Sequence, residues 1–148
     1  MKKVLLYLLF CCVVSFAGVQ THFISFGPRV AVAFGESWDV TLGFETSYWV
    51  HNFGSESMRG GAGFNIGIEQ YLSGRTDLYS ELQFGMPYAG LSVGGFRTIA
   101  GDDLKWGFQS TVWGLVFVGV DYRYKYNGAS EHQLGAIGRY FVDIYEKK

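Results

Sequence analysis

Six ionisable residues lie within apolar, alternating stretches of this sequence, where a buried charge is costly unless a partner compensates it. All six have odd numbers, so on extended segments their side chains fall on one face. Carboxylates and guanidinium groups that share a face can form forked, charge-assisted hydrogen bonds. The set predicts a buried ion-pair network, a narrow pathway for ions or protons, or a site for a small polar ligand. The six residues are Arg29, Glu45, Glu69, Glu81, Arg123 and Arg139.

Two of the glutamates flank a turn-forming stretch at residues 73–76, Ser-Gly-Arg-Thr. Glu69 and Glu81 lie on either side of it, so we expect them to be close cross-strand neighbours. Two carboxylates that close repel each other and require a cation. The arginines belong to predicted strands near the two ends of the chain, which become neighbours if the sheet closes. We therefore expect an acidic wall opposite a basic wall, with Glu45 reaching toward Arg29 or its basic neighbours.

The elements that must position these groups are β-strands. After the N-terminal segment, alternation of apolar and polar residues recurs eight times, and short stretches rich in Gly, Asn, Ser and Asp separate the repeats. The break before the seventh strand has only one turn former, Gly114. The expected strands cover residues 23–34, 38–50, 61–72, 77–86, 90–99, 103–111, 114–126 and 132–145.

Seven of these strands carry their apolar residues at even positions. The fifth strand is the exception, because Leu91 and Val93 are odd and Phe96 is even. The Gly94-Gly95 step between them suggests a β-bulge that resets the register. The even-numbered residues that we expect to face lipid include Val40, Leu42, Phe44, Val116, Val118 and Val120.

The volume of the side chains predicts which face is inside. Closing an antiparallel sheet removes its edges, and the interior of an eight-stranded barrel is just wide enough to be filled by side chains. The odd face is thinned by glycine, whereas the even face is bulky and almost free of charge. A Lys or Arg facing lipid at mid-membrane costs roughly 2–4 kcal/mol. We therefore predict an all-β fold, an eight-stranded antiparallel up-and-down transmembrane β-barrel with the charged face lining its lumen. The odd-face glycines are Gly27, Gly43, Gly63, Gly67, Gly85, Gly107, Gly119 and Gly135.

The N-terminus has the pattern of a secretory signal peptide. Lys2 and Lys3 precede an apolar run over residues 4–16, and small residues occupy positions 15 and 17. We expect residues 1–17 to be a signal peptide and residues 18–148 to form the barrel domain. Both cysteines, Cys11 and Cys12, would then be removed, which leaves no disulfide and no thiolate metal site. The remaining ten basic and 13 acidic side chains exclude the charge pattern of a nucleic-acid binder.

With these features, the chain resembles the small outer-membrane β-barrels of Gram-negative bacteria, the opacity-porin-like class. The resemblance implies export to the bacterial outer membrane, contact with outer-membrane lipids and lipopolysaccharide, and insertion by the barrel-assembly machinery. Two features depart from that class: the last aromatic residue, Tyr145, is followed by three charged residues, and the longest break, residues 51–60, follows the second strand. Aromatic residues cluster near strand ends, as in interfacial girdles, at Trp38, Tyr48, Tyr88, Trp106, Tyr122, Tyr124 and Tyr126.

The function predicted from these features is a structural or interaction role for a barrel with a filled, polar lumen. The alternatives are a narrow pore for ions or small solutes, a soluble secreted lipocalin-like barrel that binds a ligand, and an outer-membrane lipid-modifying hydrolase. We expect no catalytic residue, cofactor or metal site. His51 and His132 should lie at opposite barrel ends, and residues 130–132, Ser-Glu-His, are expected to be solvated because adjacency in sequence is not triad geometry.

Overall fold

A computed structural model of the chain describes residues 21–53, 60–86, 89–100, 103–115 and 119–146. These residues form strands joined by short connections, and none of them forms a helix long and apolar enough to cross a bilayer. The strands are β1 (Thr21–Phe34), β2 (Trp38–Phe53), β3 (Gly60–Tyr71), β4 (Thr76–Met86), β5 (Ala89–Ala100), β6 (Asp103–Leu115), β7 (Gly119–Tyr126), β8 (Ser130–Ile137) and β9 (Tyr140–Glu146).

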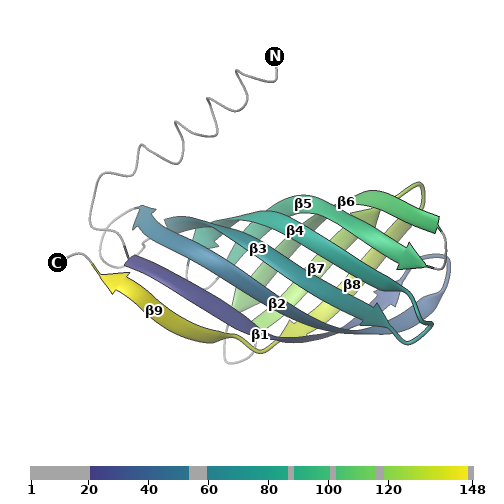
Figure 1. Cartoon of the computed structure of the whole chain (residues 1–148), viewed down its shortest axis with the longest axis horizontal. Helices are drawn as coiled ribbons and strands as arrows, with labels where there is room; N and C mark the ends of the chain where they lie inside the picture. Colours follow the sequence, from purple (N-terminus) through teal and green to yellow (C-terminus); the bar gives the residue numbers. More distant parts are fainter. Residues whose placement is uncertain (1–20, 54–59, 87–88, 101–102, 116–118, 147–148) are drawn as a thin grey trace, which may run out of the picture.

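The strands close into an antiparallel barrel (Figure 1). Each strand from β1 to β7 pairs with the next in the chain, and β1 also pairs with β8 and β9. β8 and β9 are two halves of one barrel strand, interrupted opposite Pro28 of β1. Proline has no N–H to donate to a ladder, and here Gly138 N–H donates to the Pro28 carbonyl across 3.0 Å instead. The predicted eight-stranded up-and-down barrel is therefore confirmed.

The boundary between the sixth and seventh strands was predicted wrongly. β6 continues to Leu115, because Gly114 is a ladder residue that pairs with Ala89 and Val120 and does not form a turn. Alternation also persists through the expected break, where Val112 is exposed and Trp113 is buried. Two residues that we expected to face lipid, Val116 and Val118, lie outside the described residues.

The β-bulge predicted in the fifth strand is absent. The ladders of β5 with β4 and β6 run without a register shift, and Phe96 is buried while Leu91 and Val93 point outward. The parity of β5 inverts because Met86 pairs with Ala89. Two paired residues of an antiparallel ladder point to the same face, so an even-numbered connection exchanges odd and even positions. The connection from β5 to β6 also spans two residues and restores the original parity.

The two ends of the barrel differ in their connections. The end that holds the start of β1 and the end of β9, at the left of Figure 1, is called the terminal end here. The opposite end, called the turn end, carries the turns at residues 35–37, 72–75 and 127–129. The backbones of His51, late in β2, and His132, early in β8, lie at opposite ends, as predicted.

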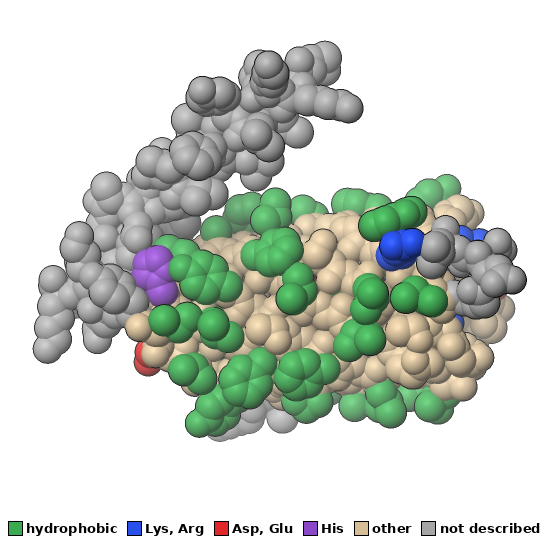
Figure 2. Space-filling view, viewed as in Figure 1, with side chains coloured by type: hydrophobic (Ala, Val, Ile, Leu, Met, Phe, Trp, Pro, Cys, Tyr) green, Lys and Arg blue, Asp and Glu red, His purple; other side chains and the backbone are tan. Residues whose placement is uncertain are grey.

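The outer wall of the barrel is apolar. Leu42, Phe44 and Val120 are each about half exposed, and Val40 is partly exposed. On the face shown in Figure 2, hydrophobic side chains are spread along the wall, and charged and histidine side chains lie only near its two ends. This distribution is the reverse of a soluble barrel, which points its apolar face inward.

The inner wall pairs glycines with aromatic rings. Each of four lumen glycines lies directly across the ladder from an aromatic residue whose ring covers it. An added Cβ atom would come within 2.3 to 2.8 Å of ring atoms, so the glycines make room for these rings. The pairs are Gly63 with Trp49, Gly67 with Tyr79, Gly90 with Trp113, and Gly107 with Phe96.

Candidate functional site

The six charged residues singled out in the sequence lie inside the barrel. Five of them, each from a different strand, are at most 3% exposed, and the side chain of Arg139 is 5% exposed. A charge in such a position needs a partner, because an uncompensated buried ion is strongly disfavoured. The five most buried are Arg29, Glu45, Glu69, Glu81 and Arg123.

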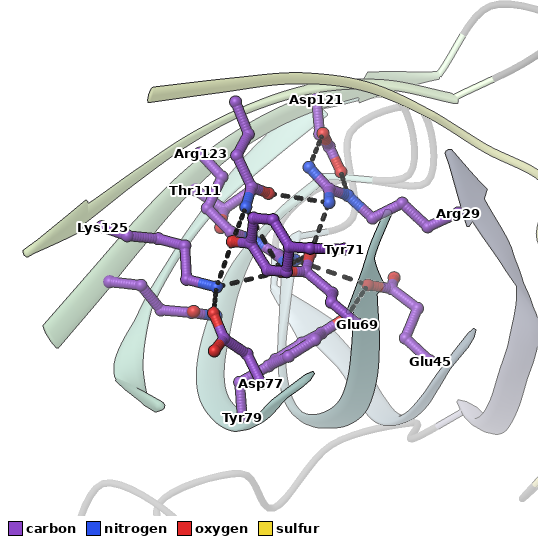
Figure 3. Close-up of polar contacts among 12 residues, drawn as sticks. Arg29, Glu45, Glu69, Tyr71, Asp77, Tyr79, Thr111, Asp121, Arg123 and Lys125 are labelled. Atoms are coloured by element: carbon purple, nitrogen blue, oxygen red, sulfur yellow. Dashed lines mark hydrogen bonds and ion pairs between the residues drawn. The ribbon is translucent and has the colours of Figure 1, made fainter. Parts of the chain in front are cut away.

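Glu69 on β3 is the centre of the network (Figure 3). Its Oε1 atom accepts hydrogen bonds from Arg29 Nη1, at 2.5 Å, and from Arg123 Nη1. Its Oε2 atom accepts from Lys125 Nζ at 3.0 Å and from Gln133 Nε2 at 3.3 Å. These donors come from β1, β7 and β8, so one fully buried carboxylate connects β3 to the facing wall of the barrel.

Glu69 and Glu81 are not cross-strand neighbours, contrary to the prediction. Glu69 pairs with Asp77, and Glu81 pairs with Asn65. The hairpin is centred on Ser73, not on Arg75, because Gly74 adopts a φ of 99° that closes the turn early. Glu69 therefore has a carboxylate as its cross-strand neighbour, as expected, but that carboxylate belongs to Asp77 and not to Glu81.

Lys125 Nζ supplies the cation that this pair needs. It donates to Glu69 Oε2, to Asp77 Oδ2 and, across 3.1 Å, to the Tyr71 hydroxyl. The ammonium group thus lies between the two carboxylates and neutralises their repulsion.

Two further ion pairs complete the basic side of the lumen. Arg29 makes a forked contact with Asp121, with Nε at 2.7 Å and Nη2 at 2.8 Å from its two oxygens. Arg139 Nη2 lies 2.6 Å from Glu45 Oε1, and the Tyr79 hydroxyl donates to the other Glu45 oxygen at 2.9 Å. Glu45 therefore pairs with Arg139, which is one of the basic neighbours of Arg29. The predicted basic wall also contains a carboxylate, Asp121, which binds Arg29.

Glu81 is held differently, because neutral groups are its nearest partners. Gln109 Nε2 and the Thr111 hydroxyl donate to Oε1 at 2.8 and 2.7 Å, and Asn65 Nδ2 donates to Oε2 at 3.3 Å. Its ion pair with Arg123 is long, with Nη2 lying 3.8 Å from Oε2. Among the lumen carboxylates described here, Glu81 thus has the weakest ionic compensation.

A second group of charges closes the turn end. Arg75 Nη2 lies 2.5 Å from Glu131 Oε2, and the Tyr71 hydroxyl donates to Glu131 Oε1. Burial lowers the pKa of the Arg75 guanidinium, but Tyr71, Asp77 and Glu131 beside it raise it more, so the pKa lies above its ordinary value. Glu131 is consequently a partnered residue, not the solvated one that the sequence suggested. These groups border a cavity of about 130 Å³ lined by Gly35, Glu36, Ser37, Arg75, Phe96, Lys125, Asn127, Ala129, Ser130 and Glu131.

The Ser-Glu-His stretch at residues 130–132 does not form a catalytic triad. Glu131 points into the barrel, whereas the Ser130 hydroxyl contacts the Tyr124 hydroxyl at 3.1 Å. His132 Nδ1 contacts the Tyr122 hydroxyl at 2.5 Å, so the imidazole and the carboxylate serve separate clusters. Alternation along β8 separates them, since adjacent residues of a strand face opposite sides.

Aromatic rings fill the lumen toward the terminal end. Trp49 and Trp113 are 2% and 6% exposed and meet edge to face with centroids 5.6 Å apart. The Phe23 ring stacks on Trp49 at 6.2 Å, and the Arg139 guanidinium lies 5.2 Å from the Trp113 centroid. The lumen is thus packed by ion pairs in its middle and by rings beyond them.

Several members of the network were missed in the sequence. Their positions are odd, like those of the six residues singled out, so the same parity would have identified them. The prediction failed because it considered only glutamate and arginine and placed the turn near Arg75 incorrectly. The missed residues are Asn65, Tyr71, Asp77, Tyr79, Gln109, Thr111, Asp121, Lys125 and Gln133.

No protein-family model matches the sequence, and no curated protein matches it significantly. The structure is similar to a barrel from "De novo design of transmembrane beta-barrels", with a TM-score of 0.54 and 14% identity over 80% of this chain and 95% of that one. The chain has the fold of a transmembrane β-barrel. This result confirms the predicted fold class, and the likeness to small outer-membrane barrels holds at the level of the fold.

Two natural barrels are also similar. Neisserial surface protein A has a TM-score of 0.31 and 12% identity over 80% of this chain and 95% of its own. Ail, the attachment invasion locus protein of Yersinia pestis, has a TM-score of 0.22 and 9% identity over 83% of this chain and all of its own.

Proposed function

We propose that the protein is a small integral outer-membrane β-barrel with a structural or interaction role and a lumen that does not conduct. The observation that carries this proposal is Glu69. Its carboxylate is fully buried and receives three cationic donors from β1 and β7. An ion that moved through the lumen would have to break these contacts, and breaking a buried pair costs roughly 3–5 kcal/mol.

The membrane location is supported by the apolar outer wall and by the signal-peptide pattern at residues 1–17, which lie outside the described residues. In this proposal residues 18–148 form the barrel, the assembly machinery inserts it, and lipids and lipopolysaccharide contact its wall. Purified protein refolded in detergent should show heat-modifiable migration on a gel, and the native protein should fractionate with the outer membrane.

A narrow pore is the main competing function, and planar-bilayer recording distinguishes the two. The refolded wild type should give no discrete openings. Glu69→Ala should give openings, because it removes the central carboxylate, whereas the turn variant Glu36→Ala should stay silent. Discrete, ion-selective openings of the wild type would contradict the sealed-lumen proposal.

A lipid-modifying hydrolase remains the catalytic alternative. Because Glu131 and His132 face opposite sides of β8, we expect purified protein to leave phospholipid and lipopolysaccharide intact. Hydrolysis that is lost in His132→Ala would require this proposal to be abandoned.

A further inference from the structure

Among the described residues, the buried charges of the lumen together with the Arg75–Glu131 pair include one carboxylate more than they include cations. Four cations each have a carboxylate partner: Arg29 with Asp121, Arg123 with Glu69, Lys125 with Asp77, and Arg139 with Glu45. Arg75 and Glu131 neutralise each other at the turn end. Glu81 is left over, and at 1% exposure its negative charge has little access to solvent.

The hydrogen bonds around Glu81 favour the ionised carboxylate. Asn65 Nδ2 and Gln109 Nε2 can only donate. The Thr111 hydroxyl already accepts a hydrogen bond from Arg123 Nε at 3.0 Å, so its own hydrogen is directed to Glu81. All three neighbours therefore act as donors, which suits a charged carboxylate that only accepts hydrogen bonds.

Three buried oxygen atoms without hydrogen-bond partners belong to residues on the same part of the sheet as Glu81. Gln83 Oε1, Ser92 Oγ and Gln109 Oε1 have no partner, and their residues are at most 1% exposed. Each would cost free energy if nothing satisfied it. Gln109 also contacts Glu81 directly through Nε2, so its free oxygen belongs to the same amide group that binds the carboxylate.

The strand register gathers these groups on one patch of the lumen wall. Glu81 of β4 pairs with Gly94 of β5, which pairs with Gln109 of β6. In the next row, Gln83 pairs with Ser92. Gly94 contributes no side chain between Glu81 and Gln109, and the Gln109 amide reaches past it to the Glu81 carboxylate.

We infer that Glu81, Gln83, Ser92 and Gln109 bind one monovalent metal cation of the Na⁺ class. Carboxylate, amide and hydroxyl oxygens are hard ligands that suit alkali and alkaline-earth ions. A single carboxylate matches a single positive charge. No group of three His, Cys, Asp or Glu residues that could hold a metal occurs in the described part of the chain, which disfavours a divalent ion. The cation would complete the charge balance of the lumen and satisfy the free oxygens together.

Thermal unfolding of the refolded full barrel in detergent tests this inference, with NaCl compared against choline chloride at equal concentration. A ligand that binds only the folded state raises the Tm with its concentration. We expect Na⁺ to raise the wild-type Tm by about 3–5 °C relative to choline, a shift that follows from saturating a site in a domain of this size. Glu81→Gln should abolish the shift, whereas Glu36→Gln should retain it in full.

A second variant protects the test against misfolding of Glu81→Gln. Ser92→Ala keeps the carboxylate but removes one ligand, so we expect the half-saturating Na⁺ concentration to rise by about tenfold. Equal Tm values in Na⁺ and choline, or an undiminished Na⁺ shift in both variants, would overturn the inference.

Discussion

At the scale of single residues, the barrel depends on charges that have no access to water. The Glu69 carboxylate forms ion pairs with Arg29, Arg123 and Lys125. Removing it leaves each of these three cations with one carboxylate partner fewer. Breaking a buried pair from one side is far more costly than losing an exposed charge. The odd-numbered position of Glu69 in its strand was sufficient to predict that its side chain faces the lumen. It could not show how many partners this side chain has.

Glu69→Ala should lower the free energy of unfolding by roughly 3–5 kcal/mol. Urea unfolding of the refolded barrel in detergent measures this change. Glu36→Ala in the exposed 35–37 turn is the control, because that carboxylate is open to solvent, and it should change stability by less than about 0.5 kcal/mol. Similar midpoints for the two variants would show that the lumen charges do not hold the barrel together.

At the scale of strands, alternation predicted eight segments and the side that each residue faces, because period two is a property of extended backbone. Register was not predictable in the same way, since it depends on the geometry of each turn. The positive φ of Gly74 moved Glu69 opposite Asp77, and the two-residue connection after Met86 inverted β5. Both errors began in turns, where one residue more or fewer changes every contact downstream.

The pairing of glycines with rings leads to a prediction at this scale. In Gly67→Ala the new Cβ would lie 2.3 Å from the Tyr79 ring. This ring is buried, and its hydroxyl donates a hydrogen bond to Glu45. We expect a loss of about 1–3 kcal/mol in unfolding free energy. Gly95→Ala is the matched control on the outer wall, where the nearest atom would be 3.4 Å away. Equal stability of the two variants would contradict the steric role of the lumen glycines.

At the scale of the whole molecule, the barrel is apolar outside and polar inside. Its four tryptophans report on this directly. Trp38 and Trp106 are 78% and 71% exposed on the outer side, and Trp49 and Trp113 are buried in the lumen. Membrane insertion should therefore bring only the first two into contact with lipid.

Fluorescence quenching by phospholipids brominated near the headgroup tests this claim most directly. The barrel is refolded into such vesicles as two double variants, one with phenylalanine at positions 49 and 113 and one with phenylalanine at positions 38 and 106. The first variant, which keeps Trp38 and Trp106, should be strongly quenched relative to unbrominated lipid. The second, which keeps Trp49 and Trp113, should retain nearly all its emission. Strong quenching of Trp49 and Trp113, or none of Trp38 and Trp106, would contradict the proposed orientation of the two faces.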